Sequence, residues 1–294
     1  MKFEIPAPRP RMECVLDETF TRDIPKVQVY IGKIADRKNT SKSIVLLNAI
    51  HPVYNLQHLK RVRGGTEILL CLADGIDDPI EFLTNIGYNI AFLDEDILKI
   101  DVASEPPKTR KQFEQANKLW PCNFHEDKYV EKLVNNTYSE KEMEVHEKWM
   151  RMALECHGVV IVDPKGGTCI ASSSSKLDEH PLQHSIMVAI DHVARSQGGG
   201  AWGHPTVEET LLKGHDGPYL CTDYYAYCFR EPCIMCAMAL VHSRVKKVFY
   251  SVPSKNGVLG TSLKLHVVKA LNHHYEVYKG VLYEEGVKLL EKDK

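Results

Sequence analysis

The feature that most constrains this chain is a pair of cysteines that directly follows a proline, in the segment Glu231-Pro232-Cys233-Ile234-Met235-Cys236. Proline is favoured at the first position of a helix, so we expect a helix to begin here with both thiols on one face of its first turn. The positive end of a helix favours the thiolate, which is the form that binds metal. Without further context, a Cys-x-x-Cys segment could also be redox-active or part of a core.

A histidine upstream supplies the missing context. His184 lies in the first turn of a second helix, which we expect to start at about Pro181. Together, His184, Cys233 and Cys236 make a His/Cys/Cys set that leaves one position for water, as zinc-dependent deaminases do. We therefore predict that these three residues bind Zn²⁺.

One part of a deaminase site is missing from this set. In those enzymes a glutamate two residues after the histidine moves protons between water and the base, and here that position is Ile186. Isoleucine has no titratable group, whereas general acid–base catalysis contributes roughly 100- to 10,000-fold to a rate. The site is therefore expected to bind metal and to do little chemistry.

The residues around these ligands resemble one protein family. The matching stretches are Glu231-Pro232-Cys233-x-x-Cys236-Ala237-x-Ala239, His180-Pro181-Leu182-x-His184-x-x-Met187, Tyr219-Leu220-Cys221-Thr222, Gly257-x-x-Gly260 and Leu271-Asn272-His273-His274-Tyr275. They look like the noncatalytic subunit of the eukaryotic heterodimeric tRNA adenosine deaminase. The resemblance is strong over residues 139–290 and weak over the N-terminal half.

The resemblance implies a partner and a substrate. The chain would pair with a catalytic deaminase subunit, and the pair would convert the wobble adenosine of the tRNA anticodon arm to inosine. His184, Cys233 and Cys236 would be the zinc ligands, and Ile186 would occupy the proton-shuttle position, as is typical of this subunit. A second departure agrees: active members carry an asparagine where this chain has Ala171-Ser172-Ser173-Ser174-Ser175.

The pattern of apolar residues predicts a C-terminal domain over residues 138–294. Ser139 and Glu142 predict a capping box at the start of a long amphipathic helix. A β-hairpin (159–162 and 168–172), the His184 helix, a loop (195–218), a strand (219–224), the Cys-x-x-Cys helix, two strands (245–252 and 277–282) and a terminal helix are then expected, in that order. This order resembles the cytidine-deaminase-like α/β/α three-layer fold.

The sequence of the N-terminal half predicts a smaller α/β domain over residues 1–102, with the ferredoxin-like arrangement as its candidate topology. After a Pro-rich tail (1–20), we expect strands at 27–31, 67–72 and 90–102 and helices at 41–50, 56–62 and 77–86. Residues 103–137 read as a connector, because Glu105-Pro106-Pro107-Lys108 and Trp120-Pro121 interrupt helix formation. The aromatic side chain of Trp120 is expected to anchor the connector on a domain surface.

Two groups of cations are candidates for contacts with nucleic acid. The first is Lys60, Arg61 and Arg63, and the second is Lys108, Arg110 and Lys111, with Lys118 nearby. The first group can also be read as a solvated helix end. The formal net charge of −2 argues against a uniformly basic binder, but local phosphate-contacting surfaces are compatible with it.

Composition limits the cellular setting. Nine cysteines in an irregular pattern, without a signal peptide, indicate a reducing compartment, and no apolar run reaches the roughly 20 residues of a membrane span. We therefore expect a soluble protein of the nucleus and cytoplasm.

Two other functions stay open: an active nucleoside deaminase that uses Asp178 or Glu179 as its proton shuttle, and a zinc-stabilised interaction module unrelated to RNA.

Overall fold

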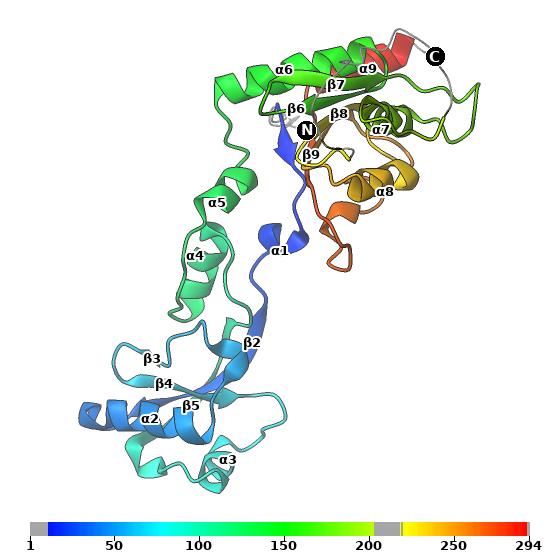
Figure 1. Ribbon diagram of the computed structural model, residues 1–294. Helices are drawn as coiled ribbons and strands as arrows, with labels where there is room; N and C mark the ends of the chain where they lie inside the picture. Colours follow the sequence, from blue (N-terminus) through cyan, green and yellow to red (C-terminus); the bar gives the residue numbers. More distant parts are fainter. Residues whose placement is uncertain (1–10, 203–217, 219, 293–294) are drawn as a thin grey trace. The chain divides into compact units, whose positions relative to one another are not determined.

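The computed structural model describes residues 11–202, 218 and 220–292, and it divides the chain into two compact units (Figure 1). The N-terminal unit is Glu18–Glu131, and the C-terminal unit combines Met1–Asp17 with Lys132–Lys294. These boundaries differ from the expected division into 1–102, 103–137 and 138–294. Residues 103–131 belong to the N-terminal unit, and the start of the chain belongs to the C-terminal one.

A four-stranded antiparallel sheet forms the centre of the N-terminal unit. Its elements follow one another as β2 (Lys26–Ile34), α2 (Thr40–Ile50), β3 (Val62–Arg63), β4 (Glu67–Leu72), α3 (Pro79–Asn85) and β5 (Leu93–Ala103). The strands lie in the order β3-β4-β2-β5. A β-α-β-β-α-β succession in this antiparallel order is the ferredoxin-like arrangement, which confirms the expectation for this unit.

Both faces of this sheet are covered. On one face, Leu47 of α2 and Leu83 of α3 pack in the same buried cluster as Tyr30 of β2. On the other face, the helix α4 (Arg110–Leu119) and Trp120 pack in a cluster with Val29. Trp120 is fully buried, so the expectation that it anchors its segment is confirmed. The segment expected to be a connector is therefore a layer of the unit.

One element of the N-terminal unit was predicted wrongly. The expected helix at 56–62 is a single 3-10 turn, η2 (Tyr54–Leu56), followed by extended chain that leads into β3. Leu59 forms a β-bridge with Cys122, and the carbonyl of Arg61 accepts a hydrogen bond from the N–H of Leu69. Pairing with these distant segments takes the backbone groups that a helix would use.

The C-terminal unit contains a six-stranded mixed sheet between two layers of helices. Its strands are β1 (Glu13–Cys14), β6 (Val159–Asp163), β7 (Thr168–Ser173), β8 (Tyr225–Arg230), β9 (Lys247–Val252) and β10 (Glu276–Lys279), in the order β1-β10-β9-β8-β6-β7. Strands β8, β9 and β10 are parallel, and the other pairs are antiparallel.

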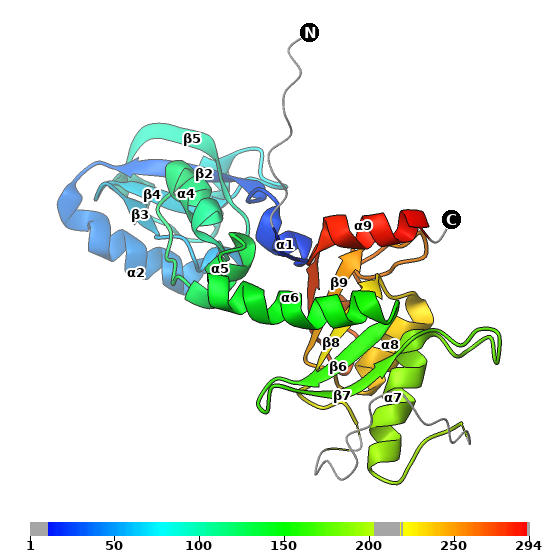
Figure 2. The ribbon, with the colours of Figure 1, turned by 90° about the horizontal axis from the view of Figure 1, so that it is seen from above.

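Two helices cover each face of this sheet. The helices α6 (Glu140–Glu155) and α9 (Tyr283–Lys292) lie on one face, and α7 (Ser185–Ser196) and α8 (Ile234–His242) lie on the other (Figure 2). The expected α/β/α three-layer domain is confirmed. The capping box at the start of α6 is present, since Ser139 and Glu142 each accept a hydrogen bond from the other's backbone N–H.

Three details of the C-terminal unit differ from expectation or lie outside its described part. The strand expected at 219–224 begins later, as β8 at Tyr225. The residues just before it form a turn, in which the N–H of Tyr224 donates to the carbonyl of Cys221. The Pro-rich tail contributes β1, whose Glu13 pairs with Lys279 of β10. Most of the expected loop at 195–218 lies outside the described residues.

The remaining regular structure is short. It consists of the helices α1 (Glu18–Thr21) and α5 (Lys128–Val134) and the 3-10 turns η1 (Arg37–Asn39), η3 (Ile90–Phe92) and η4 (Leu265–Val267). Among the helices that the structure describes, none is long and apolar enough to cross a membrane.

Candidate metal centre

The predicted metal ligands meet where two helices of the C-terminal unit begin. The helix α7 begins at Ser185 and not at about Pro181, so His184 is its N-cap and does not lie in its first turn as expected. Cys233 is the N-cap of α8. Cys236 lies in the first turn of α8, so the two thiols share one face of the helix as expected. Each helix directs its positive end at this point, which favours anionic ligands there.

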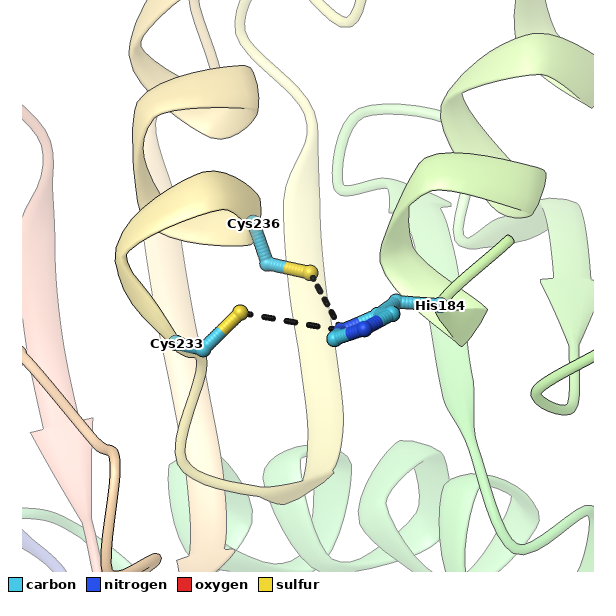
Figure 3. A group of neighbouring side chains, drawn as sticks. All are labelled: His184, Cys233 and Cys236. Atoms are coloured by element: carbon cyan, nitrogen blue, oxygen red, sulfur yellow. Dashed lines mark hydrogen bonds between the residues drawn. The ribbon is translucent and has the colours of Figure 1, made fainter. Parts of the chain in front are cut away.

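The separations between the ligand atoms fit a tetrahedral zinc ion. The Nδ1 atom of His184 lies 3.6 Å from the Sγ atom of Cys233 and 3.6 Å from that of Cys236 (Figure 3). With Zn–S bonds of about 2.3 Å and Zn–N bonds of about 2.0–2.1 Å, a tetrahedral ion holds nitrogen and sulfur about 3.6 Å apart. The histidine nitrogen therefore already stands at the distance from each thiol that the ion requires.

The electrostatics of the two thiols also call for a cation. Burial raises the pKa of Cys236 far above its ordinary value, and the neighbouring Cys233 raises it further. Two thiolates close together in a buried place need a positive charge between them. Zn²⁺ supplies that charge and binds the thiolate form.

Among the described residues, the position of the deaminase proton shuttle holds an apolar side chain. Ile186 is only 4% exposed and packs in the same hydrophobic cluster as Cys236. Over the described part of the chain, the metal-ligating group of His184, Cys233 and Cys236 includes no carboxylate. Asp178 and Glu179, the alternative proton shuttles, are both exposed and are not part of this group.

Sequence reasoning missed the role of Glu231. This carboxylate is 3% exposed and accepts hydrogen bonds from the backbone N–H groups of Leu259 (2.8 Å) and Thr261 (3.0 Å) and from the Thr261 hydroxyl. A Cβ atom at Gly257 would lie 2.2 Å from the carboxylate, so only glycine leaves room for it. Both residues stood in quoted motifs, but nothing in their spacing indicated that they touch.

The first group of cations is not a single exposed cluster. Arg63 pairs with Glu67 (2.6 Å), and its guanidinium lies 4.5 Å over the ring of Trp120. Arg61 donates to two backbone carbonyl groups, and burial lowers its pKa to about 10. Lys60 is exposed.

The second group of cations lies at the start of α4 and is exposed. Lys108 donates to the hydroxyl of Thr19 (2.7 Å). The other two contacts are ion pairs: Arg110 with Glu126 (3.5 Å) and Lys111 with Asp23 (3.3 Å). Exposed ion pairs of this kind contribute at most about 1 kcal/mol, so a phosphate group could replace the carboxylates at little cost.

The three-layer fold, with one histidine and two cysteines at the N-termini of adjacent helices, defines a domain of the zinc-dependent deaminase class. A family model for the cytidine and deoxycytidylate deaminase zinc-binding region matches residues 140–252. A model for the N-terminal domain of the tRNA-specific adenosine deaminase TAD3 matches residues 27–120. The second match extends through α4, in agreement with the unit that the structure defines.

Several curated proteins are similar along most of their length. The probable inactive tRNA-specific adenosine deaminase-like protein 3 of Danio rerio is 36% identical over 91% of this chain and 90% of its own length. The Homo sapiens protein of that name is 35% identical, over 92% and 89%. The tRNA-specific adenosine deaminase subunit TAD3 of Saccharomyces cerevisiae is 28% identical, over 81% and 79%. The chain belongs to the TAD3 family of tRNA-specific adenosine deaminase-like proteins.

Proposed function

We propose that this chain is the noncatalytic, zinc-binding subunit of a heterodimeric tRNA adenosine deaminase. Its catalytic partner would convert the wobble adenosine of the tRNA anticodon arm to inosine. This proposal rests on two features of one site: the His184, Cys233 and Cys236 ligand set is intact, and the proton-shuttle position is occupied by the buried Ile186. Family membership supports it, because relatives are named as tRNA deaminase subunits or as probable inactive deaminase-like proteins.

Zinc has a structural role in this proposal. His184, Cys233 and Cys236 would hold the ion, which would join the start of α7 to the start of α8. A bound zinc ion can lower the pKa of a water molecule, but Ile186 cannot move a proton to or from that water. The ion would then stabilise the folded subunit and its assembly with the partner.

The N-terminal unit has the second role, which is to bind tRNA. A subunit that serves many tRNAs needs contacts that tolerate different sequences, and Lys and Arg side chains that meet phosphates provide them. Lys60, Arg61, Lys108, Arg110 and Lys111 are the candidates. Arg63 is a further candidate, although Glu67 and Trp120 also contact its guanidinium. The proposal includes a nuclear and cytoplasmic location.

The decisive experiment measures inosine in a tRNA with a wobble adenosine. The chain alone, the catalytic deaminase subunit of the same organism alone, and the two co-expressed are compared at equal concentration. We expect inosine from the co-expressed pair and none from this chain alone. Deamination by this chain alone, or a partner that is equally active without it, would overturn the proposal.

A further inference from the structure

A cavity of about 320 Å³ opens in the N-terminal unit, between α2, the segment that follows it, and β4. Its polar lining consists of two cations, Lys60 and Arg61, and two amides, Asn48 and Gln57, and no carboxylate lines it within the described residues. The rest of its wall is apolar and includes Val53 and Leu56. A cavity with an apolar wall, amides and cations, but no acid, fits an anionic ligand that also has a flat apolar part.

Arg61 is a half-buried cation that lacks a counter-charge among the residues that the structure describes. Its Nη2 atom donates to the carbonyl oxygens of His51 (3.3 Å) and Leu70 (3.0 Å), which hold the guanidinium in place. Its Nε atom is buried and has no hydrogen-bond partner among the described residues, and no ion pair to Arg61 is formed there either. Removing a charge from water without pairing it costs free energy, which an anion in the cavity would offset.

Lys60 projects from a fixed point at the same cavity. Its backbone N–H donates to the carbonyl of Pro121 (2.9 Å), and its carbonyl accepts a hydrogen bond from the indole N–H of Trp120 (2.6 Å). The side chain itself is exposed. A second, mobile cation therefore stands beside the fixed guanidinium of Arg61, as is suitable for a phosphate group that is partly in solvent.

An exposed aromatic side chain lies next to the cavity in sequence. Tyr54 is 73% exposed and directly follows Val53, which lines the wall. An exposed tyrosine beside cations is a common platform for the bases of single-stranded nucleic acid, because every base has a face that can stack on the ring.

We infer that this cavity binds one unpaired nucleotide of RNA. The base lies against Tyr54 and the apolar wall, the amides of Asn48 and Gln57 reach its polar edge, and the phosphate meets Lys60 and Arg61. This inference rests on the proposed tRNA-binding function and names the part of the N-terminal unit that performs it. Because stacking and phosphate contacts do not depend on the base, the cavity suits tRNAs of different sequence.

Equilibrium binding of tRNA by the complete heterodimer, measured at several salt concentrations, tests the inference. Tyr54→Ala removes the stacking ring and is expected to weaken binding about 5- to 150-fold, whereas Tyr54→Phe keeps the ring and should bind like the wild type. Lys60→Gln should weaken binding and reduce the slope of log K against log salt by about one. These two positions are exposed, so the variants leave the buried contacts of Arg61 intact.

The matched control is Lys38→Gln, which removes one exposed charge near the opposite end of α2 from Asn48. Unlike Lys60→Gln, it should leave both the affinity for tRNA and the slope of log K against log salt unchanged. Equal effects of the two lysine variants, or wild-type affinity in Tyr54→Ala, would overturn the inference. If the wild-type heterodimer itself fails to bind tRNA, the proposed function fails instead, so the two failures are distinguishable.

Discussion

The carboxylate of Glu231 accepts a 2.8 Å hydrogen bond from the backbone N–H of Leu259, 28 residues further along the chain. Thr261 adds two more hydrogen bonds to the same carboxylate. Cys233 forms a β-bridge with Gly257, so the segment that Glu231 holds also contacts a candidate metal ligand. The Glu-Pro-Cys and Gly-x-x-Gly motifs are thus two parts of one arrangement beside the metal centre.

Replacing this carboxylate should destabilise the C-terminal unit. Glu231→Ala leaves the buried N–H group of Leu259 without an acceptor, at about 1–3 kcal/mol, and it also removes the two hydrogen bonds from Thr261, at about 0.5–1.5 kcal/mol each. We expect the free energy of unfolding to fall by about 2–5 kcal/mol in urea denaturation. Glu179→Ala, which removes an exposed carboxylate, should change it by less than about 0.5 kcal/mol. Equal stability of the two variants would contradict the role of Glu231.

Loss of one thiol should remove the metal and the stability that it contributes. Cys233→Ser is expected to abolish stoichiometric zinc, measured by elemental analysis, and to lower the melting temperature. At a free zinc concentration of about 1,000 times Kd, zinc binding adds about 4 kcal/mol to the free energy of unfolding. A chelator should destabilise the wild type by as much as the Cys233→Ser substitution does, and it should have no further effect on the variant. Cys156→Ser, outside the metal site, should keep its zinc; retention of zinc by Cys233→Ser would refute the ligand assignment.

Adding the missing glutamate should not create an enzyme. The Ile186 side chain is packed in the core, so Ile186→Glu places a carboxyl group among apolar atoms, where burial raises its pKa and the protein loses about 2–5 kcal/mol of stability. Inosine formation by this variant alone is expected to stay at background. Ile186→Leu, the control for packing, should cost less than about 1.5 kcal/mol. Measurable deamination by the glutamate variant would show that the position opens to substrate.

Acid should weaken the C-terminal unit through His146. Burial, with a smaller effect of Lys247, lowers the pKa of His146 from 6.5 to about 4, and its Nδ1 atom lies 3.0 Å from the hydroxyl of Tyr227. Because the folded protein binds this proton less readily than the unfolded chain, stability is complete above about pH 6.5 and falls as the pH drops toward about 4.

Urea denaturation at several pH values measures this effect. The wild type should lose up to about 1.4 kcal/mol per pH unit over this range through His146. His146→Phe keeps a ring against Phe249, which stacks on His146 with ring centroids 4.4 Å apart, but it cannot titrate. Its stability should therefore depend less on pH, and identical pH slopes for the two proteins would exclude His146 as the source.

Predictions from the sequence succeeded where short-range patterns dominate. The strand expected at 67–72 coincides with β4, and the Ser139 capping box is formed, because a short apolar run and a capping box each involve residues within a few positions of one another. The expected connector failed for the opposite reason. The burial of Trp120 against the sheet and the helix α4 depend on a surface that only the folded N-terminal unit presents.

The same distinction applies to function. The candidate ligand set of His184, Cys233 and Cys236 and the expected lack of a proton shuttle at Ile186 follow from residue types and spacing alone, since each candidate ligand needs only to stand near a helix start. The cavity at Arg61 and the contact between Glu231 and Leu259 could not be predicted in this way. They join segments that are distant in the chain, and their geometry depends on how the strands and helices pack, which local propensity does not specify.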